Sequence, residues 1–150
     1  MNITIIGTGY VGLVTGACFA DLGNHVSCID IDKRKLRSIK NLSIPFYEPG
    51  LKEIISRNIK ESRIQFTHSY SDISASDLIF LCIDTPQGKN GRPNLTNLNS
   101  CIDLIVKNFN QSMVIVTKST VPIGTNAKLL DRLNRDLKKK NVKVSICANP

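Results

Sequence analysis

Short apolar segments of strand length alternate with longer amphipathic segments throughout this chain of 150 residues. We expect strands at 3–6, 25–30, 64–67, 77–83, 113–117 and 142–148, helices at 11–22, 32–40, 50–60, 95–109 and 125–140, and a turn at 70–75. This alternation is typical of β-α-β units, whose right-handed crossovers build a parallel sheet with helices on both faces. We therefore predict one α/β domain over residues 1–150, with a doubly wound, mainly parallel sheet of about six strands.

The first strand-like segment runs directly into a glycine-rich sequence, Gly-Thr-Gly-Tyr-Val-Gly at residues 7–12. In this position Gly7 permits a tight turn, Gly9 lets the backbone approach a diphosphate, and Gly12 lets the next helix pack closely on the sheet. Free N–H groups at the start of that helix favour an anionic ligand. A strand, this glycine spacing and a helix in succession form a dinucleotide-binding fingerprint, so we expect the fold to be of Rossmann type.

Asp30 ends the second predicted strand, 18 residues after Gly12. A carboxylate at this point can accept hydrogen bonds from both hydroxyls of an adenosine ribose, and it repels the 2′-phosphate of NADP. We therefore expect NAD as the cofactor. Three basic residues that follow closely, Lys33, Arg34 and Lys35, weaken that preference.

The net charge of +8 is concentrated in two predicted helical segments, at 33–40 and 128–143. Neither segment has interleaved aromatic side chains that could stack on bases, which favours solvated helix faces over a nucleic-acid surface. No apolar run approaches the ~20 residues of a membrane span, and the N-terminus lacks a signal-peptide pattern. We predict a cytoplasmic protein with no nucleic-acid and no membrane partner.

Five scattered cysteines without CxxC spacing indicate reduced thiols rather than disulfides or a metal site. Four of them lie in predicted strands or on the first helix, where a cysteine is usually a small buried residue. Cys101 lies on a predicted helix and is no better placed to act as a nucleophile than the other four. We expect the following side chains to be buried or structural rather than catalytic: Cys18, Cys28, Cys82, Cys147, His25 and His68.

Several separated segments carry a resemblance to a known family. Besides the glycine sequence they are Cys-Ile-Asp-Ile-Asp at 28–32, Ile-Pro-Phe-Tyr-Glu-Pro-Gly-Leu at 44–51, Thr-Lys-Ser-Thr-Val-Pro-Ile-Gly-Thr at 117–125 and Ala-Asn-Pro at 148–150. Together they make the whole chain resemble the N-terminal part of the nucleotide-sugar dehydrogenases, most closely those that oxidise UDP-glucose. UDP-N-acetylmannosamine and GDP-mannose are alternative substrates. An alternative of another class is a stand-alone NAD-binding regulatory module.

The resemblance implies an oxidoreductase that converts a UDP-sugar, UDP-glucose, into UDP-glucuronate with two NAD+ and water, through a cysteine thioester. It places the nucleophilic cysteine and the catalytic lysine beyond residue 150, with a central helix and a substrate domain. On this basis we expect a cofactor-binding domain that is cut at Pro150 and is inactive alone. The full-length protein is expected to be a homo-oligomer, a dimer or larger.

The resemblance also assigns roles to residues of this chain, without any metal. Val11 contributes its backbone at the diphosphate, and Lys35 lies at the adenosine end. Thr85 and Thr120 lie by the nicotinamide ribose, and Thr120 also assists catalysis by ordering a water. The complete set expected to contact NAD is Gly7, Gly9, Tyr10, Val11, Gly12, Asp30, Lys35, Thr85 and Thr120.

Three further features lie near the predicted cleft. Asp84 stands where the family usually has Gly or Pro, which adds an unexpected carboxylate. Glu48 precedes Pro49 at the start of a predicted helix, and a helix cap is favoured over a role in shaping the cleft. The loop at 85–93 is rich in Gly and Pro and follows a strand end, so it is a candidate wall of the site.

Overall fold

A computed structural model describes residues 1–88, 91–140 and 142–150 of the chain. Two residues of the predicted site loop at 85–93, Lys89 and Asn90, lie outside the described residues.

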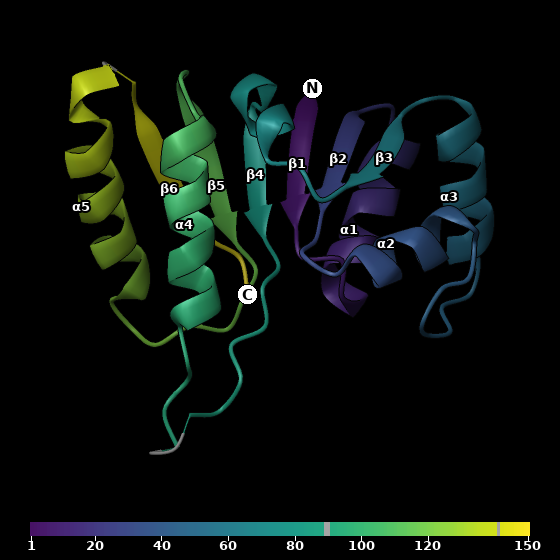
Figure 1. Ribbon diagram of the computed structural model, residues 1–150, viewed down its shortest axis with the longest axis horizontal. Coiled ribbons are helices and arrows are strands. Elements are labelled where there is room, and N and C mark those ends of the chain that lie inside the picture. Colours follow the sequence, from purple (N-terminus) through teal and green to yellow (C-terminus); the bar gives the residue numbers. More distant parts are fainter. Residues whose placement is uncertain (89–90, 141) are drawn as a thin grey trace.

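Within these described ranges, six strands form a single sheet in the order β3-β2-β1-β4-β5-β6, and every neighbouring pair is parallel (Figure 1). The strands are β1 (Asn2–Ile6), β2 (His25–Ile29), β3 (Ile64–Thr67), β4 (Leu78–Leu81), β5 (Met113–Thr117) and β6 (Val144–Ala148). The predicted parallel sheet is therefore confirmed, although the strands expected at 77–83 and 142–148 are shorter. Strand β4 ends at Leu81 because its neighbour β1 ends at Ile6, where the chain turns away.

In the described residues five α-helices lie between the strands, as predicted. They are α1 (Tyr10–Asp21), α2 (Lys33–Lys40), α3 (Leu51–Lys60), α4 (Thr96–Asn108) and α5 (Thr125–Leu137). The turn expected at 70–75 is a short 3-10 helix, η1 (Ser71–Ala75), and the end of the helix expected at 125–140 is a second one, η2 (Lys138–Lys140). Helix α2 begins one residue late because Asp32 is its N-cap, whose side chain accepts hydrogen bonds from the backbone N–H groups of Arg34 and Lys35.

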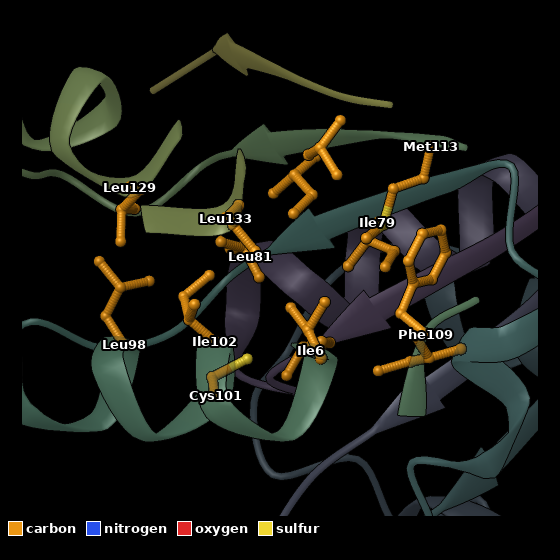
Figure 2. Packing of buried hydrophobic residues seen from close by; sticks show 14 of the residues in the cluster. Ile6, Ile79, Leu81, Leu98, Cys101, Ile102, Phe109, Met113, Leu129 and Leu133 are labelled. Atoms are coloured by element: carbon orange, nitrogen blue, oxygen red, sulfur yellow. The ribbon is translucent and has the colours of Figure 1, made fainter. Parts of the chain in front are cut away.

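The sheet separates two hydrophobic cores. Consecutive strand residues alternate between them, because side chains along a strand point to opposite faces. Ile6 packs with residues of α4 and α5, whereas Ile5 packs with residues of α1, α2 and α3. Figure 2 shows the first core, in which Leu98 and Ile102 of α4 face Leu81 of the sheet. Both faces of the sheet are thus covered, as expected for a doubly wound fold.

Because the strands are parallel, their carboxyl ends all lie at one edge of the sheet, toward the bottom of Figure 1. The chain runs outward from β1 to β3, returns, and continues from β4 on the other side of β1. Parallel α/β sheets bind ligands at this carboxyl edge, where the strand order reverses between β1 and β4. Throughout the described residues, each helix is too short or too polar to cross a membrane.

Candidate functional site

The glycine-rich turn joins β1 to α1 at the point of strand-order reversal, and two of its glycines are required by the chain itself. Gly7 has a φ of +98°, and a Cβ there would lie 2.3 Å from the carbonyl oxygen of Cys82. A Cβ on Gly12 would lie 1.9 Å from the carbonyl oxygen of Gly7 and 3.0 Å from Cβ of Cys82. Any side chain at either position would therefore force the turn away from β4.

Gly9 is different, because a Cβ on it would meet no atom of residues 1–88, 91–140 or 142–150 within 4 Å. Gly9 is the N-cap of α1, in an extended conformation with no side chain bonded to the helix end. The space in front of the first helical turn is open, and the N–H groups there carry the positive end of the helix dipole. The next two residues, Tyr10 and Val11, are exposed on this first turn.

Asp30 follows β2 and is only 7% exposed. Its Oδ2 atom accepts hydrogen bonds from the backbone N–H of Thr8 at 2.8 Å and from the Thr8 hydroxyl at 2.7 Å. The Nζ atom of Lys35 lies 2.5 Å from the same oxygen, and the other oxygen, Oδ1, accepts the Asp32 backbone N–H at 2.9 Å. The carboxylate is thus tied both to the glycine-rich turn and to α2.

These contacts decide the charge of Asp30. Burial opposes ionisation, but the hydrogen bonds from Lys35, Asp32 and Thr8 outweigh it and hold the pKa of Asp30 below its ordinary value. The site therefore presents a carboxylate at neutral pH, with one ammonium group beside it.

A cleft of about 340 Å³ lies at the carboxyl ends of β1, β2 and β4. It brings together four of the predicted residues, Gly7, Gly9, Asp30 and Lys35. Asp84 also lines it and is exposed, so the extra carboxylate does face the site. A larger hollow of about 480 Å³ lies at the amino ends of the strands, away from the glycine-rich turn.

One wall of the cleft was not foreseen from the sequence. It is formed by one face of α4, with Tyr70 nearby, and its α4 residues are Asn97, Ser100, Cys101 and Leu104. Their spacing of three and four residues places them on one helix face, so this signal was present in the sequence. Burial disfavours the thiolate form of two thiols at the cleft, raising the pKa of Cys82 to about 11 and that of Cys101 to about 12.

The expected nicotinamide-side residues lie where β4 and β5 end, outside the lining of this cleft. The hydroxyl of Thr85 donates a hydrogen bond of 2.8 Å to the carbonyl oxygen of Thr120. Ser119, to which the sequence assigned no role, accepts the Ile83 backbone N–H at 2.9 Å. The loops after the two strands are therefore joined by side chains.

The prediction that Glu48 caps a helix is wrong. Helix α3 has Gly50 as its N-cap, with no side chain bonded there. The carboxylate instead accepts a 2.6 Å hydrogen bond from the Tyr10 hydroxyl, which raises the pKa of that phenol, and the Tyr10 ring stands edge-on to Phe46 at 5.0 Å. This contact joins the glycine-rich turn to the Tyr-Glu-Pro-Gly-Leu segment.

The expected burial of the cysteines holds only in part. Cys28 and Cys101 are buried and Cys82 is half-buried, but Cys18 and Cys147 are exposed. Cys18 lies on the outer face of α1, and Cys147 lies on the edge strand β6. Within the described part of the chain, no group of three or more His, Cys, Asp or Glu side chains could hold a metal ion.

A doubly wound parallel sheet with a glycine-rich turn between β1 and α1 and a carboxylate after β2 defines a dinucleotide-binding domain. Comparison with known proteins identifies its kind. The family model described as the NAD binding domain of the UDP-glucose/GDP-mannose dehydrogenase family matches residues 1–150. The chain belongs to this family, and its cofactor is NAD.

Individual relatives support this assignment. The chain is 44% identical over 150 residues to UDP-glucose 6-dehydrogenase TuaD of Bacillus subtilis, covering 99% of this chain and 32% of that protein. It superimposes with a TM-score of 0.86 and 28% identity on a UDP-glucose dehydrogenase of Pyrobaculum islandicum, over 99% of this chain and 35% of the other. For GDP-mannose dehydrogenase of Pseudomonas aeruginosa the TM-score is 0.89 at 26% identity, over 100% and 36%. The chain thus spans about a third of the length of these relatives.

Proposed function

We propose that this chain binds NAD along the carboxyl edge of its sheet, with the adenosine half in the 340 Å³ cleft. Asp30 accepts a hydroxyl of the adenosine ribose, and Lys35 lies beside it. The first turn of α1 receives the diphosphate through backbone N–H groups at Gly9, Tyr10 and Val11. When bound, NAD supplies the hydride acceptor, and the protein supplies binding and orientation.

The observation that carries this proposal is the open space at Gly9. The chain's own backbone requires glycine at positions 7 and 12, since a Cβ at either would clash within the fold. Among the described residues, no atom lies within 4 Å of a Cβ placed on Gly9, so the fold there does not exclude a side chain. A group from outside the chain that must approach the backbone closely, such as a diphosphate, explains a glycine there.

The two carboxylate oxygens of Asp30 support a preference for NAD over NADP. The Oδ2 atom already faces three donors, while Oδ1 accepts, within the described part of the chain, only the Asp32 N–H. A carboxylate has about four lone-pair positions, so Oδ1 retains capacity for a ribose hydroxyl. A 2′-phosphate would meet this negative charge. Lys35 reduces the repulsion without removing it, so we expect weaker but measurable binding of NADP+.

In a longer protein, the chain serves as the N-terminal NAD-binding part of a cytoplasmic, homo-oligomeric nucleotide-sugar dehydrogenase. This proposal rests on family membership and on relatives named UDP-glucose 6-dehydrogenase. The reaction is oxidation of the C6 alcohol of UDP-glucose to a carboxylate, with Thr85 and Thr120 beside the nicotinamide ribose and Thr120 assisting. UDP-N-acetylmannosamine and GDP-mannose remain the competing substrates, since the dehydrogenases named for these two sugar nucleotides share this fold.

A calorimetric titration of the purified chain with NAD+, NADP+ and UDP-glucose tests the proposal. We expect NAD+ to bind, NADP+ to bind more weakly and UDP-glucose not to bind. A folded chain that does not bind NAD+ would contradict the cofactor site. A longer form that binds NAD+ but does not reduce it with UDP-glucose would contradict only the substrate assignment, and the two competing sugar nucleotides would then be tested.

A further inference from the structure

The pairing of β4 with β5 ends before the residues proposed to face the nicotinamide ribose. Leu81 and Thr117 are the last paired residues, and the Leu81 carbonyl accepts the backbone N–H groups of Lys118 and Ser119 at 3.0 and 3.1 Å. Beyond that point the segments that follow β4 and β5 must be held together by other contacts. Thr85 lies four residues after Leu81, and Thr120 lies three residues after Thr117.

The Ser119 side chain makes that connection. It is 8% exposed, and its hydroxyl oxygen accepts the Ile83 N–H at 2.9 Å. The same hydroxyl lies 2.6 Å from the Ile83 carbonyl oxygen, to which it donates, and 3.2 Å from that of Leu81. One hydroxyl therefore satisfies both backbone groups of Ile83, which requires a side chain that can donate and accept at once.

A second link follows two residues later, where the Thr85 hydroxyl donates to the Thr120 carbonyl. One residue before Ile83, the Cys82 N–H donates a hydrogen bond of 2.8 Å to the Ile6 carbonyl of β1. The segment is thus anchored at Cys82 by the sheet, at Ile83 by Ser119 and at Thr85 by Thr120. Loss of the middle anchor would free the chain progressively from Ile83 toward Thr85.

We propose that Ser119 is a positioning residue, which sets the distance between the loops after β4 and β5 and so places Thr85 and Thr120 against the nicotinamide half of NAD. This inference rests on the proposed function. Ser119 itself contacts backbone, not cofactor. Its loss should affect the nicotinamide side more than the adenosine side. Ile83 and Asp84 do line the adenosine cleft, but Asp30, Lys35 and the glycine-rich turn are tied to one another by hydrogen bonds that do not involve Ser119.

The test compares the affinities of NAD+ and ADP, which contains only the adenosine and diphosphate part, in the wild-type chain and in Ser119→Ala. We expect NAD+ binding to weaken by about fivefold or more, and ADP binding by less than about twofold. Ser119→Thr keeps the hydroxyl and should restore the wild-type ratio. Ser74→Ala is the matched control, because the Ser74 hydroxyl donates to the Ser71 carbonyl, outside the cleft.

Each outcome decides the proposal. Equal weakening of both ligands in Ser119→Ala, or unchanged NAD+ binding, overturns it, as does a wild-type chain that binds ADP as tightly as NAD+. A wild-type chain that binds neither ligand instead overturns the proposed function. If Ser119→Ala does not fold, Ser119→Cys fills the same space with only a weak donor and acceptor, and the same selective loss of NAD+ is expected.

Discussion

At the scale of single residues, the three glycines of the turn meet different physical demands. Gly7 adopts a backbone conformation that side chains disfavour, Gly12 leaves no room for a Cβ, and Gly9 has room for one. The close contacts at Gly7 and Gly12 agree with the roles in turn formation and helix packing expected from the sequence. A substitution at Gly9, which has room for a Cβ, is the one that tests the effect on a bound ligand.

We predict opposite outcomes for Gly12→Ala and Gly9→Ala. The Gly12→Ala variant should lose about 3 kcal/mol of unfolding free energy, because its Cβ meets backbone that cannot move aside. The Gly9→Ala variant should lose about 1 kcal/mol or less, the cost of a poorer N-cap, while NAD+ affinity falls about tenfold or more. Urea unfolding and calorimetry measure both quantities. Full NAD+ affinity in Gly9→Ala would contradict the diphosphate assignment.

The charge of Asp30 predicts a pH dependence. Its pKa is lowered in the folded chain, so its stabilising contribution is present above the unfolded value, near 3.8, and is lost as pH falls through the folded pKa. Replacement by Asn should cost about 2 kcal/mol at pH 7, since charged hydrogen bonds to Thr8 and Lys35 are lost. Urea unfolding of both proteins between pH 7 and pH 2 should show this difference shrinking at the acidic end. A difference that is constant with pH would contradict this role of the carboxylate.

At the scale of elements, α2 links the Asp30 carboxylate to the hydrophobic core that contains Ile5. Its N-cap Asp32 accepts the Arg34 and Lys35 N–H groups at 2.9 and 3.1 Å, and its buried Leu36 and Ile39 pack against the sheet. The cap fixes where the helix begins, and so where Lys35 stands relative to Asp30. The start of α2 and the position of Lys35, a residue of the proposed site, therefore depend on the same side chain.

Removal of this cap should weaken the chain measurably. Asp32→Ala leaves two N–H groups of α2 without their side-chain acceptor and should cost about 1 kcal/mol of unfolding free energy. The control is Asp32→Asn, which keeps a capping oxygen and should change stability by only a few tenths of a kcal/mol. Thermal unfolding of the three proteins tests this, and equal losses in both variants would show that charge, not capping, is responsible.

Element boundaries also show how far local patterns extend. The strands and α-helices that the structure describes were all expected from apolar periodicity, because burial of one or both faces imposes that periodicity on each segment. The differences lie at the ends, such as β4 stopping at Leu81 and the last α-helix stopping at Leu137. A strand ends where its neighbour does, which a single segment does not encode.

At the scale of the whole molecule, two cores meet across one sheet, and the proposed site lies at the edge where both end. Binding there stabilises the fold by mass action. At an NAD+ concentration of about 100 times its Kd, the unfolding free energy should rise by about 2.7 kcal/mol and the Tm by roughly 5–10 °C. Thermal unfolding with NAD+, with NADP+ and with Gly9→Ala as a control measures this, and equal shifts in the variant and the wild type would place the ligand elsewhere.

The sequence by itself determined the fold class, the glycine-rich turn, Asp30 and the family, because each depends on residues close together in the chain or on the period of one segment. Tertiary structure decided which distant residues meet: Tyr10 with Glu48, Ser119 with Ile83, and α4 with the cleft. It also decided that Cys18 and Cys147 are exposed. Such contacts join segments about 35 to 40 residues apart, and they follow from strand order and register, which only the packing of the complete sheet establishes.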